Sequence, residues 1–417
     1  MERVILHCDQ NCFFASVELL SHPDLRDVPM AVCGDPASRH GIILAKNEPA
    51  KRFGIQTAET VWQARRKCPS LVLLPPHHKL YREYSVRVNE LYGQYTDLVE
   101  PFGIDESWLD ITGSMHLFGG DPVAIADELR RRVREELGLS ISVGVSFNKI
   151  FAKLGSDLRK PDATTVVDRL HFRESVWPLP AGALLFVGAS TRRRLEKNGV
   201  RTIGDLARSA PEALERLLGK NGRMLWLFAN GCDDSPVART TARLLIRSVG
   251  NGTTAPRDLT SDADVKLVLN GLCESVSSRL RKKGVVCGGV QVGVRYADLQ
   301  SYERQRALPL PCRASSVLLR ESFALFRESR ETGRPVRSLY VRAYGLADEL
   351  GDPTLLPDPP QLRRAEALDA AVDRLRERFG YESIQKGLML TDRRLAAFAP
   401  TAGNAIHPDL FFKNETI

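Results

Sequence analysis

The stretch "GIDESWLD", from Gly103 to Asp110, places two adjacent acids, Asp105 and Glu106, inside an otherwise apolar run. In a regular strand neighbouring side chains point to opposite faces, so one of these acids would enter the core. Burying an unpaired carboxylate is costly in free energy. At the tight turn of a hairpin, however, both acids point to one side and share a cation. The stretch therefore indicates either a solvated hairpin turn or a metal-binding turn, and other parts of the chain decide between them.

A third acid, Asp9, ends a short strand predicted over Val4–Asp9, where it shares a face with Ile5 and His7. If this strand lies beside the hairpin, three carboxylates converge from two strands. Oxygen ligands of this kind suit Mg²⁺ or Mn²⁺, which bind through few carboxylates plus substrate phosphates. Two such ions at roughly 3.5–4 Å activate an attacking oxygen and stabilise a leaving one.

The elements around these acids predict an α+β sheet layer. A helix is expected over Asp121–Gly138, with a cap residue, a proline in its first turn and a terminating glycine. Alternation over Ser140–Ser146 predicts a half-buried strand. Leu184–Ala207 is typical of two short helices joined by a glycine turn, and Leu362–Phe379 of a final amphipathic helix.

Length and composition limit the class of protein. The 417 residues suggest about three domains, and 43% hydrophobic with 26% charged residues is typical of a soluble globular chain. No apolar run reaches the length of a membrane span, and "MERVILHCDQ" is not typical of a signal peptide. The eight cysteines form no CxxC pair. We therefore expect a cytoplasmic protein with no membrane partner and no disulfide framework.

The basic charge is concentrated in one segment. The formal net charge is +8, yet Arg239–Leu346 alone holds 19 Lys+Arg and 9 Asp+Glu, a net charge of +10, so the remainder sums to −2. Such segregation indicates a polyanionic partner, most often nucleic acid. A merely solvated charged surface is the alternative.

Further cations lie in the segments that contain or neighbour the acids. A lysine before a proline at a helix end grips a polyphosphate as a point charge, although any single lysine is more often a solvated cation. The candidates are Lys149, Lys153, Arg159 and Lys160 within "SVGVSFNKIFAKLGSDLRKPDA" and Lys51 and Arg52 within "NEPAKRFG".

Four motifs, "HCDQNCFFASVE", "GIDESWLDITGS", "SVGVSFNKIFAKLGSDLRKP" and "VRTIGDLA", occur in an order and spacing that resemble a Y-family DNA polymerase of the bacterial DinB type. The likeness extends from about Met1 to Leu346. It implies a right-hand polymerase with palm, fingers, a helix-hairpin-helix thumb and a little finger. The implied domains are palm at 1–10 and 78–166, fingers at 11–77, thumb at 167–231, linker at 232–243, little finger at 244–346, and a Pro-rich linker with a helical tail at 347–417.

The resemblance also assigns the site. Asp9, Asp105 and Glu106 would be the catalytic acids that hold two Mg²⁺ ions, with Mn²⁺ as a substitute and the main-chain carbonyl of Gln10 as a further ligand. Phe14 would be the steric gate, whose ring fills the space of a ribose 2′-OH, while Phe13 would be core. The full set of expected nucleotide contacts is Gln10, Asn11, Cys12, Phe13, Phe14, Ala45, Lys51 and Lys160.

The expected partners are primer–template DNA, a dNTP and a sliding clamp, with the chain acting as a monomer. Backbone N–H groups at Gly188 in the thumb hairpin would hold DNA phosphates without reading bases. The other expected DNA contacts are Ser190, Arg247, Arg295 and Arg342.

Several residues depart from the family pattern. Asn11 stands where an acid is common, and "GAS" at 188–190 replaces a more glycine-rich hairpin. Ala45 and Glu48 stand where Thr and Tyr hydroxyls touch the triphosphate, and Lys51 replaces a more familiar arginine; we expect Glu48 to turn outward and pair with a nearby cation. Of a clamp-binding peptide only Gln361 and Leu362 remain, and "PDLFF" at 408–412 is a poor substitute.

The sequence thus predicts a low-fidelity, template-directed polymerase for lesion bypass, in which the primer 3′-OH attacks the α-phosphate of a dNTP. Two alternatives remain. A non-catalytic DNA-binding accessory subunit would not need three convergent acids. A nucleotide cyclase with a related palm would need neither a steric gate nor a strongly basic terminal domain.

Overall fold

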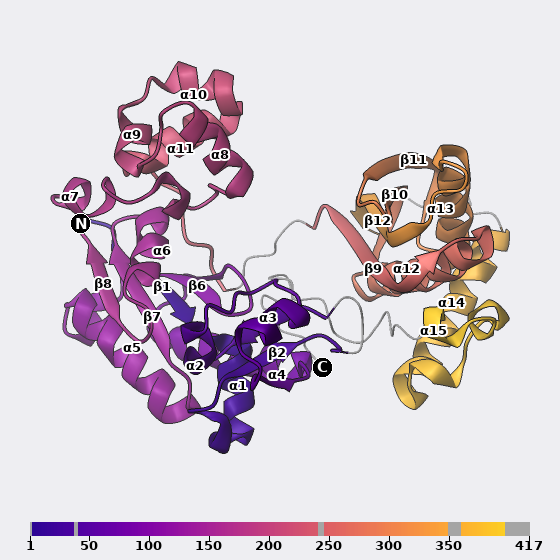
Figure 1. Ribbon diagram of the computed structural model, residues 1–417, viewed down its shortest axis with the longest axis horizontal. Helices are drawn as coiled ribbons and strands as arrows, with labels where there is room; N and C mark the ends of the chain where they lie inside the picture. The colour runs from indigo at the N-terminus through magenta and orange to yellow at the C-terminus, as the bar shows by residue number, and fades with distance from the viewer. Residues whose placement is uncertain (1, 37–40, 241–245, 349–359, 397–417) are drawn as a thin grey trace. The chain divides into compact units, whose positions relative to one another are not determined.

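The computed structural model describes residues 2–36, 41–240, 246–348 and 360–396 (Figure 1). These residues form two compact units, one up to residue 240 and the other from residue 246 onward. None of the helices among them is both long and apolar enough to cross a membrane. The Pro-rich stretch at 349–359 and the "PDLFF" peptide lie outside the described residues.

The first unit is built on a five-stranded sheet with the order β5-β6-β1-β7-β8. The strands β5, β6, β1 and β7 pair antiparallel, and β8 pairs parallel to β7. Their bounds are β5 Val99–Pro101, β6 Glu106–Asp110, β1 Ile5–Gln10, β7 Ile141–Ser146 and β8 Thr164–Val167. The strands expected over Val4–Asp9 and Ser140–Ser146 are present, and β1 does lie beside the acidic hairpin. The expectation that the second of them is half-buried is wrong, because every residue of β7 is buried.

The two faces of this sheet bury different side chains. One face packs Leu6, Leu109 and Val143 against the helices α1, α4 and α5. These helices span α1 Phe13–Ser21, α4 His78–Tyr92 and α5 Pro122–Leu137. The Asp121 side chain accepts a hydrogen bond from the Val123 N–H, and Gly138 ends α5 at φ 69°, as the cap signals predicted.

The opposite face is covered by α6, Lys149–Leu158, which approaches β7 very closely at Gly144. A Cβ atom on Gly144 would lie 1.9 Å from the carbonyl oxygen of Ala152, so only glycine permits this contact. The Asn148 side chain caps the helix by accepting from the Phe151 N–H at 2.7 Å. This close packing brings α6 side chains directly over β1, on the face that carries His7 and Asp9.

A second, three-stranded sheet in the order β3-β2-β4 lies within residues 30–74. Its own small core includes Ile43, Ala50 and Val61. The elements are β2 Met30–Cys33, β3 Ile43–Lys46, α2 Glu48–Arg52, α3 Val61–Lys67 and β4 Val72–Leu74.

The remainder of the first unit is helical. The elements are α7 Phe172–Val176, α8 Ala189–Lys197, α9 Ile203–Arg208, α10 Pro211–Leu218 and α11 Lys220–Ala229. The expected pair of short helices over Leu184–Ala207 is confirmed as α8 and α9, with Gly199 at φ 80° between them. In the predicted linker, Val237 is buried and the Ala238 N–H donates to Glu100 at 2.8 Å, so residues 232–240 pack against the first unit.

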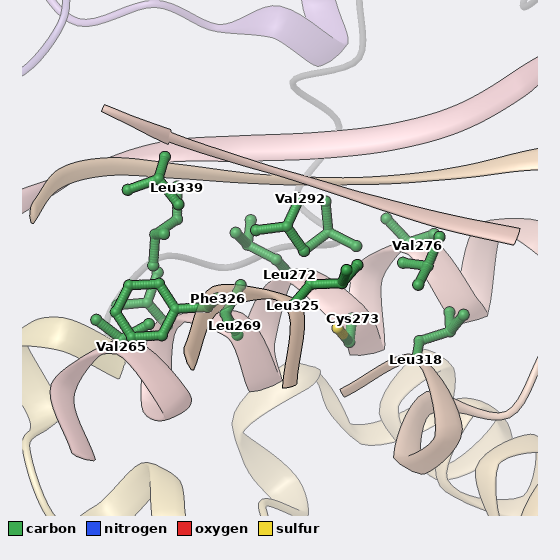
Figure 2. Close-up of a cluster of buried hydrophobic side chains, with 14 of the residues drawn as sticks. Val265, Leu269, Leu272, Cys273, Val276, Val292, Leu318, Leu325, Phe326 and Leu339 are labelled. Carbon is green, nitrogen blue, oxygen red and sulfur yellow. The ribbon is translucent and has the colours of Figure 1, made fainter. Parts of the chain in front are cut away.

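The second unit is an antiparallel sheet in the order β11-β10-β12-β9, with helices on one face. Side chains of α12 and α13 meet the inner face of the sheet in a hydrophobic core that includes Leu272, Val292, Phe326 and Leu339 (Figure 2). The elements are β9 Ser248–Leu259, α12 Asp262–Lys282, β10 Val285–Tyr296, β11 Ser301–Cys312, α13 Ser315–Ser329 and β12 Val336–Asp348.

The C-terminal helices pack onto this second unit. The predicted helix is present as α14, Pro360–Phe379, followed by α15, Arg393–Ala396. Arg281 of α12 contacts Asp369 at 3.3 Å and Asp373 at 2.6 Å, and the buried Glu274 pairs with Arg376 at 2.9 Å. The tail expected to stand apart from the little finger is therefore joined to it by ion pairs over residues 360–396.

Candidate active site

The three predicted acids lie at one edge of the first sheet and line one cavity. Asp9 near the end of β1 is directly opposite Glu106 at the start of β6, and the Gln10 N–H donates to the Asp105 carbonyl at 2.9 Å. The Phe102 N–H donates to the Glu106 carbonyl at 2.9 Å, which closes the hairpin between β5 and β6. Asp105 and Glu106 therefore face the same cavity as Asp9.

Two lysines supply positive charge to these acids. Lys153 of α6 places its Nζ 3.2 Å from Asp9 Oδ2 and 3.0 Å from Glu106 Oε2. Lys160, just after α6, places its Nζ 2.7 Å from Asp9 Oδ2 and 2.7 Å from Asp157 Oδ1. Lys149 does not join them, because it pairs with Glu100 at 2.7 Å.

The three acids differ in how far nearby positive charge stabilises their ionised forms. Burial, together with the negative charges of Asp9 and Glu106, raises the pKa of Asp105 to about 7. Burial also raises the pKa of Asp9, although Lys160 and Lys153 oppose the shift. Burial would raise the pKa of Glu106 as well, but contact with His7 and the charge of Lys153 outweigh it and lower that pKa. Additional positive charge near Asp105 would stabilise its ionised form.

The donor set fits a hard divalent cation by its chemistry. Three carboxylates line one cavity, and oxygen ligands are those that Mg²⁺ prefers. The Lys153 ammonium, within 3.2 Å of Asp9 and 3.0 Å of Glu106, shows that these two carboxylates are placed to share one positive charge. Within the described residues no three His, Cys, Asp or Glu side chains are gathered as a ligand cluster.

The cavity beside the acids has a volume of about 410 Å³. Its lining includes nearly all of the nucleotide contacts expected from the sequence, and it adds Leu44, Lys46, Thr57 and Ile104. The expected residues that line it are Asp9, Gln10, Cys12, Phe13, Phe14, Ala45, Lys51, Asp105, Glu106 and Lys160. Asn11 is absent from this lining; its side chain turns toward Ser142 and Asp162.

The wall that contains Phe14 is firmly supported. Phe13 is 3% exposed and belongs to the core, whereas Phe14 is partly exposed and stacks on Tyr81 with ring centroids 4.2 Å apart. Tyr81 is fully buried, and its hydroxyl donates to the buried carboxylate of Glu18. The His77 ring also contacts Glu18, with Nδ1 2.9 Å from Oε1. These contacts hold the Phe14 ring against the cavity.

Glu48 is paired, as the sequence predicted. The Lys51 Nζ lies 2.6 Å from Glu48 Oε1, and the Cys12 thiol donates to the same oxygen at 3.3 Å. Partial burial would raise the pKa of Glu48, but these hydrogen bonds outweigh it and lower that pKa. Lys51 lines the cavity while Glu48 does not.

Two surfaces carry the expected DNA contacts. Gly188 and Ser190 are exposed at the start of α8, where the first backbone N–H groups of a helix lack partners within the helix. In the second unit Arg295 and Arg342 are exposed on the sheet face opposite the helices, and Arg247 is exposed just before β9. These positions suit phosphate contacts without base readout.

The outer sheet face of the second unit is flat and aromatic as well as basic. The Tyr340 ring lies over Gly293, where a Cβ atom would come within 1.9 Å of Cε1. The Tyr344 ring lies over Gly289 in the same way, with 2.2 Å to Cζ. The glycines thus allow both rings to lie down on the sheet beside Arg342, which leaves a broad face open to a partner.

Comparison with known proteins identifies the family. The impB/mucB/samB family matches residues 8–157, its C-terminal domain matches residues 246–354, and the thumb domain of DNA polymerase-iota matches residues 184–233. DNA polymerase IV of Acetivibrio thermocellus is 48% identical over 397 residues, which cover 95% of this chain and 99% of that protein. The chain belongs to this family, the Y-family DNA polymerases of the bacterial DinB type.

Other relatives agree. DNA polymerase IV 1 of Bacillus subtilis is 34% identical over 99% of this chain and 98% of its own length. A solved Y-family DNA polymerase chimera superposes with a TM-score of 0.74 over 83% of this chain and 99% of that chain, at 22% identity, and so shows a Y-family fold. The right-hand polymerase fold expected from the sequence is confirmed. Y-family membership also implies that a divalent metal is used.

Sequence reasoning left some site residues without a role. Lys153 was one of several candidate cations, and no pattern in the sequence indicated that it contacts both Asp9 and Glu106. Glu18 and Tyr81 gave no signal, because they are separated by 63 residues and meet only through packing. This Y-family site thus depends on contacts between distant segments.

Proposed function

We propose that this chain extends a DNA primer on a template during translesion synthesis, with Asp9, Asp105 and Glu106 as catalytic acids that hold two Mg²⁺ ions. When bound, these ions lower the pKa of the primer hydroxyl and neutralise the triphosphate. The 3′-OH loses its proton to water, its oxygen forms a bond to the α-phosphorus of the dNTP, and the bond from that phosphorus to the bridging oxygen breaks, so that pyrophosphate leaves. The Gln10 carbonyl at the end of β1 would be a further ligand.

The other cavity residues bind and select the nucleotide. Lys160 and Lys51 line the cavity and act as point charges toward the triphosphate. Phe14, held by its stack on Tyr81, takes up the space that a ribose 2′-OH requires. The two exposed surfaces at α8 and at the outer sheet of the second unit hold the DNA backbone.

The observation that carries this proposal is that one cavity is lined by three carboxylates, by the Phe14 ring stacked on Tyr81, and by Lys160. An accessory subunit has no use for such a set, and a nucleotide cyclase needs no ring at the 2′ position. Primer extension on an undamaged and an abasic template, with Mg²⁺ and dNTPs, separates these alternatives. The absence of any extension on the undamaged template would contradict the proposal.

We also propose a cytoplasmic location, where all eight cysteines would stay reduced; none of them is in a disulfide, and all lie within the described residues. Clamp binding through the Gln361-Leu362 remnant is not favoured. Leu362 packs against the core of the second unit and is not free to enter a clamp pocket.

Glu48→Gln is expected to change the KM for a correct dNTP by less than about threefold, or roughly 0.7 kcal/mol. The reason is that the Glu48 carboxylate is already paired with Lys51 and lies outside the cavity lining. Single-nucleotide insertion kinetics measure this change. Glu59→Gln, which removes a carboxylate paired with Lys67, is the matched control. A tenfold tightening in Glu48→Gln would mean that Glu48 repels the triphosphate.

Arg342→Ala is expected to weaken binding of duplex DNA to a similar degree for all sequences and to reduce the salt slope of log K by about 1. The guanidinium is exposed on the outer sheet face, held by a hydrogen bond to Ser248 at 3.1 Å. Fluorescence anisotropy across a salt series measures the slope. Arg306→Ala is the control, because Arg306 of the same sheet pairs with Glu321 and Glu328 of α13 on the helical face. An equal loss in both variants would contradict the assignment of this face.

A further inference from the structure

The loop between α6 and β8, which contains Lys160, is held at Asp162. Asp162 has a left-handed backbone at φ 52°, a conformation that Asp tolerates better than most residues. Its carboxylate accepts from Arg130 Nε at 3.1 Å and from an Arg134 guanidinium N–H at 2.7 Å. Its backbone N–H donates to the side-chain oxygen of Asn11 at 2.8 Å. Two distant segments, α5 and the end of β1, therefore hold this loop.

Asn11 connects the loop to the catalytic edge of the sheet. It directly follows β1, two residues after Asp9, and it is 5% exposed. While its oxygen accepts from the Asp162 N–H, its Nδ2 donates to Ser142 Oγ of β7 at 2.9 Å. A carboxylate at this position would have no such donor. The amide therefore bonds the loop and β7 at the same time.

This connection bears on the position of the Lys160 ammonium. The four-carbon stem of lysine has a limited length, so the region that its ammonium can reach moves with the backbone that carries it. Here Lys160 is two residues before Asp162, and its Nζ lies 2.7 Å from Asp9 Oδ2. We propose that Asn11 is a positioning residue that couples the end of β1 to the Lys160 loop. It thereby keeps the Lys160 ammonium, which binds the triphosphate, next to Asp9. This inference rests on the proposed role of Lys160.

A purely structural Asn11 makes a different prediction. Loss of a residue that only stabilises the palm would lower kcat and thermal stability and raise KM whether or not Lys160 is present. A positioning residue acts on KM through Lys160, so its effect disappears once that lysine is removed. A double-mutant cycle measures this coupling directly.

The experiment uses the full chain and steady-state insertion of a single correct dNTP. Lys160→Ala is expected to raise KM by about tenfold or more. Asn11→Ala is expected to raise KM by about three- to tenfold and to change kcat by less than about twofold. In the double variant, Asn11→Ala is expected to add less than about twofold to KM. Asn11→Asp, which keeps the acceptor for the Asp162 N–H, is expected to recover part of the loss.

Two further variants guard against a general loss of folding. Asn89→Ala is the matched control, because the Asn89 amide also bridges palm segments, accepting from Ser107 Oγ at 2.7 Å and donating to the Ser85 carbonyl at 2.8 Å, but does not contact the loop. Its KM is expected to stay unchanged. Asp162→Gly keeps a residue that tolerates positive φ and removes the carboxylate that accepts from Arg130 and Arg134, while the bond from Arg130 to the backbone carbonyl remains. It is expected to raise KM as Asn11→Ala does, again without effect in the Lys160→Ala background.

The outcomes separate the two levels of the proposal. An unchanged KM in Lys160→Ala would overturn the role of Lys160 in binding the triphosphate, and the inference with it. If Lys160→Ala does raise KM, two results would overturn only the positioning role of Asn11. One is that the effects of Asn11→Ala and Lys160→Ala on KM are fully additive. The other is that KM is unchanged in both Asn11→Ala and Asp162→Gly.

Discussion

Alanine at Asp105 or at Glu106 is expected to lower primer extension by at least about 10³-fold, which is about 4 kcal/mol of transition-state stabilisation. Both carboxylates face the cavity beside Asp9, where the proposed mechanism has them hold the cations at the reacting phosphate. Neither lies on the α8 surface or on the outer sheet face assigned to the DNA backbone. The affinity for primer–template DNA is therefore expected to stay within about twofold, or roughly 0.4 kcal/mol.

A loss of folding should not explain the loss of activity in Asp105→Ala. Burial and neighbouring acids raise the pKa of Asp105 from 3.8 to about 7, so its ionisation lowers the stability of the folded state progressively between these two pH values, and the full cost is present above pH 7. The Tm of Asp105→Ala at pH 8 is then expected to be no lower than that of the unaltered chain. Asp110→Asn, at the opposite end of β6 and opposite Ile5, is the matched control and should keep full activity. Full activity in the Asp105 or Glu106 variant would refute the two-metal assignment.

Phe14→Ala is expected to raise kcat/KM for a ribonucleotide relative to its deoxyribonucleotide by about tenfold or more, at least about 1.4 kcal/mol. The ring of Phe14 lines the cavity and is held 4.2 Å from the buried ring of Tyr81. Because this stack leaves the ring little freedom to move away, the 2′-OH of a ribonucleotide meets it directly. Truncation to alanine removes that obstacle while Tyr81 stays in place.

Insertion of each rNTP and its matching dNTP measures this selectivity. Phe13→Leu is the control, since Phe13 is 3% exposed, belongs to the hydrophobic core and keeps similar volume as leucine. Its selectivity is expected to stay unchanged. If Phe14→Ala retains polymerase activity and its full discrimination, the gate lies at another residue. A loss of discrimination in Phe13→Leu alone would move the gate to that ring.

The sequence predicted the part of the site that local patterns specify. Adjacent acids in an apolar run imply a hairpin, because a continuous strand would bury one of them, and the structure places Asp105 and Glu106 at that turn. The first strand was predicted over Val4–Asp9 from a short apolar run that ends in an acid, and β1 ends one residue later, at Gln10. Together with the long motifs, these signals were sufficient for the family and for most of the cavity lining.

The same reasoning did not give the electrostatic partners of the acids. Lys153 shares its ammonium between Asp9 and Glu106 only because Gly144 lets α6 approach β7 closely. The support of Phe14 by Tyr81 and Glu18 depends on the packing of α1 against α4. Neither the Lys153 contacts nor the support of Phe14 has a fixed sequence separation, so no periodicity or spacing in the sequence predicts them.

By itself, then, the sequence determined which residues have the chemistry: three carboxylates, a gate ring, two lysines and a basic terminal segment. The tertiary structure alone decided what each side chain faces. Asn11 turned away from the cavity to bond Asp162 and Ser142, and the C-terminal helix joined the second unit through Arg281 and Glu274. The physical reason is that side-chain chemistry is local to a residue, whereas burial and hydrogen bonding depend on which distant segments the fold brings together.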